Sequence, residues 1–77
     1  MSKLSNYLLK RRKELQLTQI QVAKEIKTSD RAISQHENGK RRPRLEKMMM
    51  YSKLYRVPIH KLYDLAIEDV KEMKKNE

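Results

Sequence analysis

Residues 18–39 read TQIQVAKEIKTSDRAISQHENG, two short helical patterns joined by a short break. Thr18 can cap the first pattern, and Gln21, three residues on, can reach back to the cap, as in a capping box. Apolar side chains at positions 22, 23 and 26 then share one face of a helix. The pattern predicts a helix over residues 19–26 that packs on a core through these three positions.

The second pattern follows Ser29, a residue typical of helix N-caps. Asp30 comes next, where the helix dipole favours negative charge. Asn38 and Gly39 tolerate the left-handed conformation that ends helices, so the sequence predicts a second helix over residues 30–37. The side chains expected to face inward are Ala32, Ile33 and His36. The polar side chains expected to face outward are Asp30, Arg31, Ser34 and Gln35.

Three further helical patterns flank this unit. One covers about residues 3–15 and a second covers about residues 45–55, each with apolar or tyrosine residues at helical spacing. A third starts near Pro58, because proline is favoured at helix starts. Its apolar positions continue to about residue 73. The core positions expected from these patterns are Leu4, Leu8, Leu15, Leu45, Met48, Tyr51, Ser52, Tyr55, Ile59 and Leu62.

The three consecutive methionines, residues 48–50, are interpreted as adaptable core filler, with Met50 the most exposed of them. The four tyrosines are interpreted as packing residues, because none is placed like a platform for stacking bases.

Composition agrees with one small helical domain. The chain has 77 residues and no cysteine, which excludes disulfides and thiolate metal sites and is compatible with a reducing cytoplasm. Its apolar runs are a few residues long, against the roughly 20 that a membrane span needs, and nothing resembles a signal peptide. We therefore expect a cytoplasmic protein, at the nucleoid, with no membrane partner.

Positive charge is concentrated in the first part of the chain. Residues 1–63 contain sixteen Lys and Arg against five Asp and Glu, a net charge of +11, whereas residues 64–77 carry a net charge of −2. A basic excess of this kind raises the local concentration of a polyanion. Lys and Arg are also ordinary solvated residues of helix surfaces, so charge alone leaves a nucleic-acid partner undecided.

The ordered set of residues resembles the Cro/repressor-type, or Xre, family of helix-turn-helix proteins over about residues 8–63. The matching positions are Arg12, Leu17, Thr18, Gln19, Val22, Ala23, Ile26, Ile33, Glu37, Asn38, Gly39, the basic run 40–44, Leu45, Val57, Ile59 and Leu62. The chain departs from the family at two places. Lys27 stands where the family usually has glycine, at some local cost in the turn. His36 stands where the family prefers an apolar or aromatic residue.

The resemblance implies an all-α fold, a compact five-helix lambda-repressor-like DNA-binding domain with an extended C-terminal helix. Residues 1–63 would form the helix-turn-helix domain and residues 64–77 a helical extension. It also implies a structural ion pair between Arg12 and Glu37; the alternative is that both side chains are simply exposed.

Contacts with double-stranded DNA divide into those that recognise bases and those that bind phosphates. The base-recognition candidates are Ser29, Asp30, Arg31, Ser34 and Gln35. Arg31 suits guanine, Gln35 adenine and Asp30 cytosine, although Asp30 can equally serve the helix dipole or orient Arg31. The phosphate-binding candidates are Gln19, Asn38, Lys40, Arg41, Arg42 and Arg44. We call residues 40–44 the basic loop; its alternative role is a solvated loop that confers solubility. Weaker candidates are Lys10, Lys13 and Lys27.

A single short helix covers about half a turn of DNA, so we expect a homodimer with two recognition helices about 34 Å apart. An apolar stripe in the extension is the candidate dimerisation element, and its residues are Leu65, Ala66, Val70 and Met73. The alternative is that this stripe covers the core of its own chain.

The pattern therefore predicts a sequence-specific transcriptional regulator, a repressor of bacterial, phage or mobile-element origin that binds an operator. The competing prediction is an antitoxin or partner-binding module with secondary DNA binding, for which Met49, Met50 and Leu54 would supply the exposed patch.

No enzyme is expected, because His36 and His60 belong to no catalytic constellation or set of metal ligands. No cofactor is expected either. The short chain shows no ligand-sensing domain, so control is expected from concentration, proteolysis or a protein partner.

Overall fold

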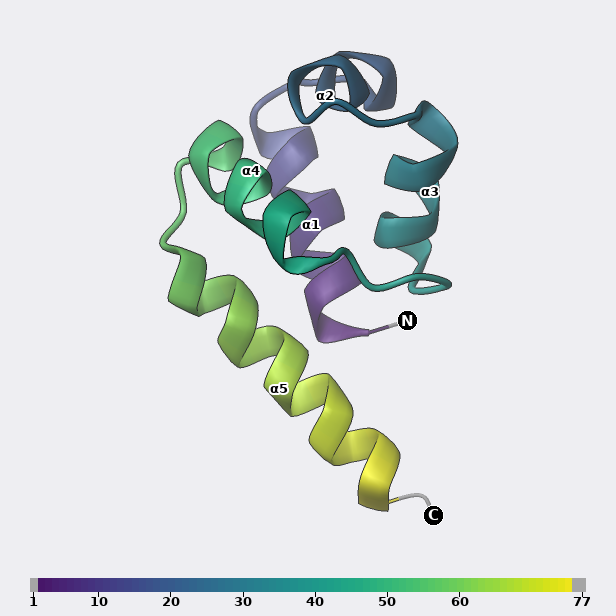
Figure 1. Ribbon diagram of the computed structural model, residues 1–77, viewed down its shortest axis with the longest axis vertical. Coiled ribbons are helices and arrows are strands. Elements are labelled where there is room, and N and C mark those ends of the chain that lie inside the picture. Colours follow the sequence, from purple (N-terminus) through teal and green to yellow (C-terminus); the bar gives the residue numbers. More distant parts are fainter. Residues whose placement is uncertain (1, 76–77) are drawn as a thin grey trace.

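The computed structural model describes residues 2–75, which form five helices and no strands (Figure 1). In chain order they are α1 (Lys3–Glu14), α2 (Gln19–Glu25), α3 (Asp30–Asn38), α4 (Leu45–Tyr55) and α5 (Ile59–Lys75). The all-α prediction is confirmed, and each helix begins and ends within about two residues of its predicted bounds. The last two residues of the predicted extension 64–77 lie outside the described range.

Side-chain caps explain where the first helices begin. Thr18 and Gln21 form the predicted capping box: the Thr18 hydroxyl accepts from the Gln21 amide at 3.1 Å, and the Gln21 side chain accepts from the Thr18 amide at 2.8 Å. Ser29 caps α3 by accepting from the Ala32 amide at 3.1 Å. Gly39, with a φ of 81°, ends α3 in the left-handed conformation.

All five helices contribute to one core. α1 packs against α3 and α5, α2 packs against α3, and α4 packs against α5. In Figure 1, α2 and α3 lie side by side at one end of the molecule, and α5 runs past α1 and α4 toward the other end. The buried apolar residues of this core are Leu4, Leu8, Val22, Ala23, Ile26, Ile33, Met48, Tyr51, Tyr55, Leu62 and Ala66.

Two predictions about α4 are wrong. Leu45 is 57% exposed, because the helix enters the core only one turn later, at Met48. Met49 is 50% exposed, whereas Met50, predicted to be the most exposed methionine, packs against the core. The face that carries Met48, Tyr51 and Tyr55 is buried, and Met49 lies about 100° around the helix from Met48.

α5 is attached to the start of α1 by its carboxylates. The Asp69 side chain, only 7% exposed, accepts from the backbone amides of Lys3 at 2.8 Å and Leu4 at 3.1 Å. It therefore satisfies two of the free amides at the N-terminus of α1. The Lys3 ammonium lies 3.2 Å from Glu72 and 3.6 Å from Glu68, and these contacts raise its pKa.

The predicted dimerisation stripe is not equally exposed along α5. Ala66 is 8% exposed and packs in the core of its own chain, so it offers a second copy only the edge of its side chain. Leu65 also packs against that core while half-buried. Val70 is half-buried, and Met73 is 62% exposed. The outward face of α5 also carries Ile67, which the prediction omitted and which is 50% exposed.

None of the helices within residues 2–75 is long and apolar enough to cross a bilayer.

Candidate nucleic-acid interface

α3 presents a polar edge to solvent and buries its opposite side. Ala32, Ile33, His36 and Glu37 are buried, Asp30 and Arg31 are exposed, and Ser34 and Gln35 are half-buried. An α-helix with its side chains is about 10–12 Å across, which a DNA major groove about 12 Å wide admits. The polar edge therefore has the size and exposure that contact with base edges requires.

The predicted base-recognition side chains are not equally free. Arg31 is exposed, and no hydrogen bond to its guanidinium is found among the described residues. The Asp30 carboxylate accepts from the Arg31 amide at 3.1 Å, a contact at the helix N-terminus. The Ser29 oxygen accepts from the Ala32 amide, which leaves its hydroxyl hydrogen for another partner. Arg31 is thus the strongest base-recognition candidate on this edge.

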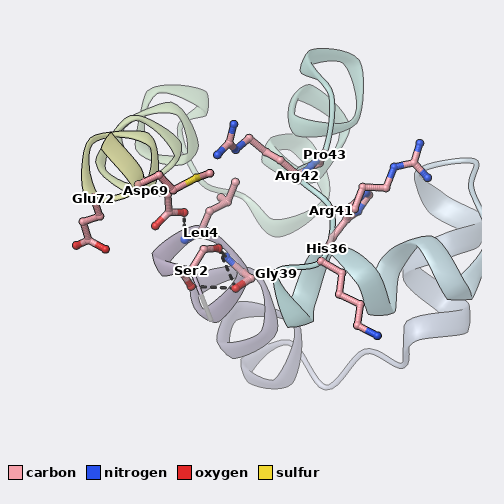
Figure 2. Close-up of a pocket in the computed structure, with 12 residues that line it drawn as sticks. Ser2, Leu4, His36, Gly39, Arg41, Arg42, Pro43, Asp69 and Glu72 are labelled. Atoms are coloured by element: carbon pink, nitrogen blue, oxygen red, sulfur yellow. Dashed lines mark hydrogen bonds between the residues drawn. The ribbon is translucent and has the colours of Figure 1, made fainter. Parts of the chain in front are cut away.

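The basic loop follows α3 directly, and its cations face solvent. Lys40, Arg41, Arg42 and Arg44 are all exposed, whereas Pro43 is buried and holds the loop on the body. The Arg41 amide donates to the Gln35 carbonyl at 3.3 Å. Figure 2 shows Arg41 and Arg42 extending from the loop in different directions. The structure therefore places four exposed cations just after α3, with the backbone of Arg41 next to Gln35.

Two phosphate-binding candidates have partners within the protein. The Asn38 side-chain oxygen accepts from the Lys40 amide at 3.0 Å, which leaves its NH₂ group exposed. The Gln19 side chain donates to Glu37 at 3.1 Å. No local pattern indicates this Gln19 contact, because it joins residues 18 positions apart on different helices. One of the two amide hydrogens of Gln19 remains for a phosphate.

Arg12 and Glu37 form a bidentate ion pair beneath the interface. Arg12 Nε lies 2.6 Å from Glu37 Oε2, and Arg12 Nη2 lies 3.1 Å from Oε1. Arg12 Nη1 also donates to the Leu17 carbonyl at 2.8 Å. The two side chains are only 13% and 4% exposed, and the hydrogen bonds to Glu37 raise the pKa of Arg12. The pair joins α1 to the C-terminal turn of α3.

His36 occupies a core position under α3. It is 5% exposed, and its Nδ1 atom lies 2.9 Å from the Tyr51 hydroxyl. The two rings meet edge to face with centroids 5.7 Å apart. Burial lowers the pKa of His36 below its ordinary value of 6.5, and the charges of Arg41 and Lys47 lower it further, against an opposing effect of Glu37. His36 therefore replaces the expected apolar residue as a neutral, hydrogen-bonded ring.

This environment predicts a pH dependence of stability. Below pH 6.5 the unfolded chain takes up a proton on this histidine before the folded chain does, because the folded pKa is lower. The free energy of unfolding should thus be unaffected above pH 6.5 and fall as the pH drops through the folded pKa, by at most about 1.4 kcal/mol per pH unit. Urea denaturation between pH 7 and pH 5.5 measures this change. His36→Phe should abolish the slope and His60→Gln, at an exposed site, should retain it; equal slopes in all three proteins would contradict the assignment.

A pocket of about 480 Å³ lies between the basic loop and the start of α1, on the side where α5 packs (Figure 2). His36, Arg41 and Arg42 line one side, and Asp69 and Glu72 line another. The Asp69 carboxylate already caps α1, as the dashed contact to Leu4 in Figure 2 shows. Among the side chains that the structure describes, no three His, Cys, Asp or Glu residues lie close enough to bind a metal ion.

The structural roles of two residues were not predicted from the sequence. Asp69 caps α1 from a position 65 and 66 residues away, and Lys47 donates to backbone carbonyls of the α2–α3 turn about 20 residues away. No local motif marks either residue, because each contact depends on how α4 or α5 lies on the body.

Comparison with known proteins gives one match that covers more than half of the chain. A family model described as Helix-turn-helix matches residues 8–62, from the middle of α1 to the first turn of α5. No curated protein and no solved structure matches the chain.

Proposed function

Because this chain belongs to the Cro/Xre-type helix-turn-helix family of DNA-binding regulators, we propose that it is a sequence-specific repressor that binds an operator through α3. Its proposed origin is a bacterium, phage or mobile element, and its proposed place of action is the cytoplasmic nucleoid. The observation that supports this function best is the exposed edge of α3 beside the basic loop, on a body with a net charge of +11 over residues 1–63.

The proposed contacts divide by chemistry. Arg31 can donate two hydrogen bonds to guanine, and Gln35 can pair with adenine. Ser29, Asp30 and Ser34 lie on the same edge of α3 and would adjust the preference for neighbouring bases. The proposed phosphate contacts are made by Gln19, Asn38, Lys40, Arg41, Arg42 and Arg44. The N-terminus of α2, beside Gln19, is a further favourable place for a phosphate.

Selection of bound sites from random duplex DNA tests this function. We expect a short motif that contains guanine, repeated with two-fold symmetry at a spacing of about one helical turn. The selection is repeated with Arg31→Ala, which should lose the preference at one position of each half-site, and with Lys53→Ala, an exposed lysine of α4, which should preserve it. Recovery of no enriched sequence by the native protein would contradict sequence-specific binding.

We propose that two copies associate through the outward face of α5. A groove on this face is lined by Tyr63, Ala66, Ile67, Val70 and Lys71. Ile67 lies at the centre of this groove and is 50% exposed, so its burial by a second copy would be favourable. If two α5 helices pack antiparallel about an axis near Ile67, Asp64 of one chain lies opposite Lys71 of the partner subunit, and the second Asp64–Lys71 pair forms by symmetry.

Replacing Ile67 with lysine should therefore convert a dimer into a monomer, because two charges would meet at the symmetry axis. Sedimentation velocity measures the change, with His60→Gln on the same helix as the control. This substitution is cleaner than truncation after Tyr63, which would also remove the Asp69 cap of α1. A native protein that sediments as a monomer, or an Ile67→Lys protein that stays dimeric, would contradict this interface.

One observation favours the second candidate function, a partner-binding or antitoxin module with secondary DNA binding. Leu45 and Met49 lie one turn apart on α4 and are 57% and 50% exposed. An apolar pair of this kind suits a protein partner that would also control activity. The site selection separates the two functions, since a module whose main partner is a protein would enrich DNA weakly or not at all.

A further inference from the structure

The turn between α2 and α3 contains a residue in an unfavourable backbone conformation. Lys27 has a φ of 57°, in the left-handed region that glycine tolerates best. The Thr28 amide donates to the Ala23 carbonyl at 2.9 Å, and the Lys27 amide donates to the Lys24 carbonyl at 3.4 Å. These two bonds form a Schellman motif, in which the left-handed position is usually glycine. A lysine at this position costs free energy relative to glycine, and a neighbouring contact can offset that cost.

Lys47 supplies such a contact from α4. Its ammonium donates to the Ile26 carbonyl at 3.0 Å and to the Lys27 carbonyl at 3.1 Å. These carbonyls follow the last turn of α2, where a positive charge is favoured by the helix dipole. One of the two bonds is therefore made to the left-handed residue itself.

We propose that Lys47 is a positioning residue for DNA recognition: its ammonium holds the α2–α3 turn in the conformation that Lys27 disfavours. α3 begins at Asp30, three residues after Lys27, so a change in this turn would shift the first turn of α3. Arg31, in the first turn of α3, would then move away from the base edges. This inference rests on the proposed function in that α3 is taken as the recognition helix.

A competing role for Lys47 is a direct contact with a phosphate. Its side chain is half-buried, and two of its three N–H groups already donate to carbonyls. A phosphate contact and a positioning role predict different results, because only the positioning role depends on the residue at position 27. Glycine at position 27 adopts the left-handed conformation without support, so it should make Lys47 dispensable.

The first test uses the free protein in four forms: native, Lys47→Met, Lys27→Gly and Lys27→Gly/Lys47→Met. Amide hydrogen exchange, followed by NMR, reports on the Thr28 amide within the turn. We expect Lys47→Met to speed this exchange by about tenfold in the native background and less than about threefold in the Lys27→Gly background. Lys53→Met, on the exposed face of α4, should change nothing. Equal effects in the two backgrounds would overturn the proposal.

The second test compares DNA affinities of the same proteins for a selected operator and for random duplex. A positioning role predicts that Lys47→Met lowers the ratio of the two affinities by about tenfold, leaves the salt dependence unchanged, and is rescued by Lys27→Gly. A phosphate contact predicts equal weakening on both duplexes and a shallower salt dependence, which would overturn the proposal.

Two further outcomes also decide the question. If Lys47→Met does not fold, a folded Lys27→Gly/Lys47→Met protein supports the proposal, and a double variant that is also unfolded overturns it. If the native protein binds no duplex, the proposed function fails, whereas the exchange measurement still determines whether Lys47 holds the turn.

Discussion

Replacing Glu37 with alanine is expected to lower the free energy of unfolding by about 3–5 kcal/mol. The Glu37 carboxylate is 4% exposed and accepts two hydrogen bonds from Arg12 and one from Gln19. Its removal leaves the Arg12 guanidinium, 13% exposed, without its countercharge in a site from which water is largely excluded. The expected cost is thus mainly that of the buried charge left behind, and not the energy of the pair itself.

Urea denaturation followed by circular dichroism measures the loss. Glu46→Ala is the matched control, because Glu46 is an exposed acid in the first turn of α4 and its loss should change stability by less than about 0.5 kcal/mol. Arg12→Met/Glu37→Met should recover much of the stability, since it removes both charges together. A Glu37→Ala protein within 1 kcal/mol of the native one would show that Arg12 is not left as a buried, unpaired charge.

A loss of stability in a Glu37 variant would also lower its measured affinity for DNA. A small domain has a total stability of roughly 5–15 kcal/mol, and 77 residues place this one near the lower end. A Glu37 variant would then be partly unfolded at 37 °C and would lose affinity for DNA without any contact between Glu37 and DNA. The DNA affinity of such a variant should therefore be interpreted together with its measured free energy of unfolding.

The sequence predicts the helices well, because the signals that define them are local. The Thr18–Gln21 capping box, the Ser29 cap and the left-handed Gly39 each involve residues within three positions of a helix end. Apolar spacing identifies the buried face of α2 for the same reason. Such short-range contacts are determined by residue type and separation alone.

Properties that depend on how whole helices pack were predicted less well. Leu45 and Ala66 both lie on apolar stripes, yet one is exposed and the other buried, because only the position of the neighbouring helix decides which part of a stripe is covered. Asp69 caps α1, and no local sequence pattern marks it for that role. The roles of Gln19 and Lys47 likewise depend on contacts between helices distant in sequence.

At the candidate interface, too, the exposure of side chains could be predicted from the sequence, whereas their hydrogen-bond partners could not. Exposure of Arg31 and of the basic loop follows from helix periodicity and from loop position, and both agree with the sequence analysis. Which side chains are already engaged within the protein does not follow from sequence. Asp30, Ser29 and Asn38 each accept a hydrogen bond from a nearby backbone amide, so fewer of their polar groups are available to DNA than their residue types suggest.

Neutralising two cations of the basic loop, in Arg41→Gln/Arg42→Gln, is expected to weaken binding to every duplex by about 10³-fold at about 0.1 M salt. A dimer would lose four phosphate contacts, and each contact contributes about 0.9 to the slope of log affinity against log salt. The native slope, expected near −5 to −7 for six to eight contacts, should therefore become less steep by about 3 to 4. Both guanidinium groups are exposed, so the fold should tolerate the change.

Arg31→Ala should behave differently, because a base contact carries sequence information and a phosphate contact does not. It is expected to cost about 1–3 kcal/mol on the selected operator and much less on random duplex, with a change of slope no greater than about 1.

The charge-matched control for the loop is Lys53→Gln/Lys61→Gln, two exposed lysines on α4 and α5. Fluorescence anisotropy over a range of salt concentrations measures all four proteins. If the control weakened binding as much as the loop variant, the effect would belong to net charge. If the loop variant instead changed the preferred sequence, Arg41 or Arg42 would contact bases, and the division between base and phosphate contacts would be wrong.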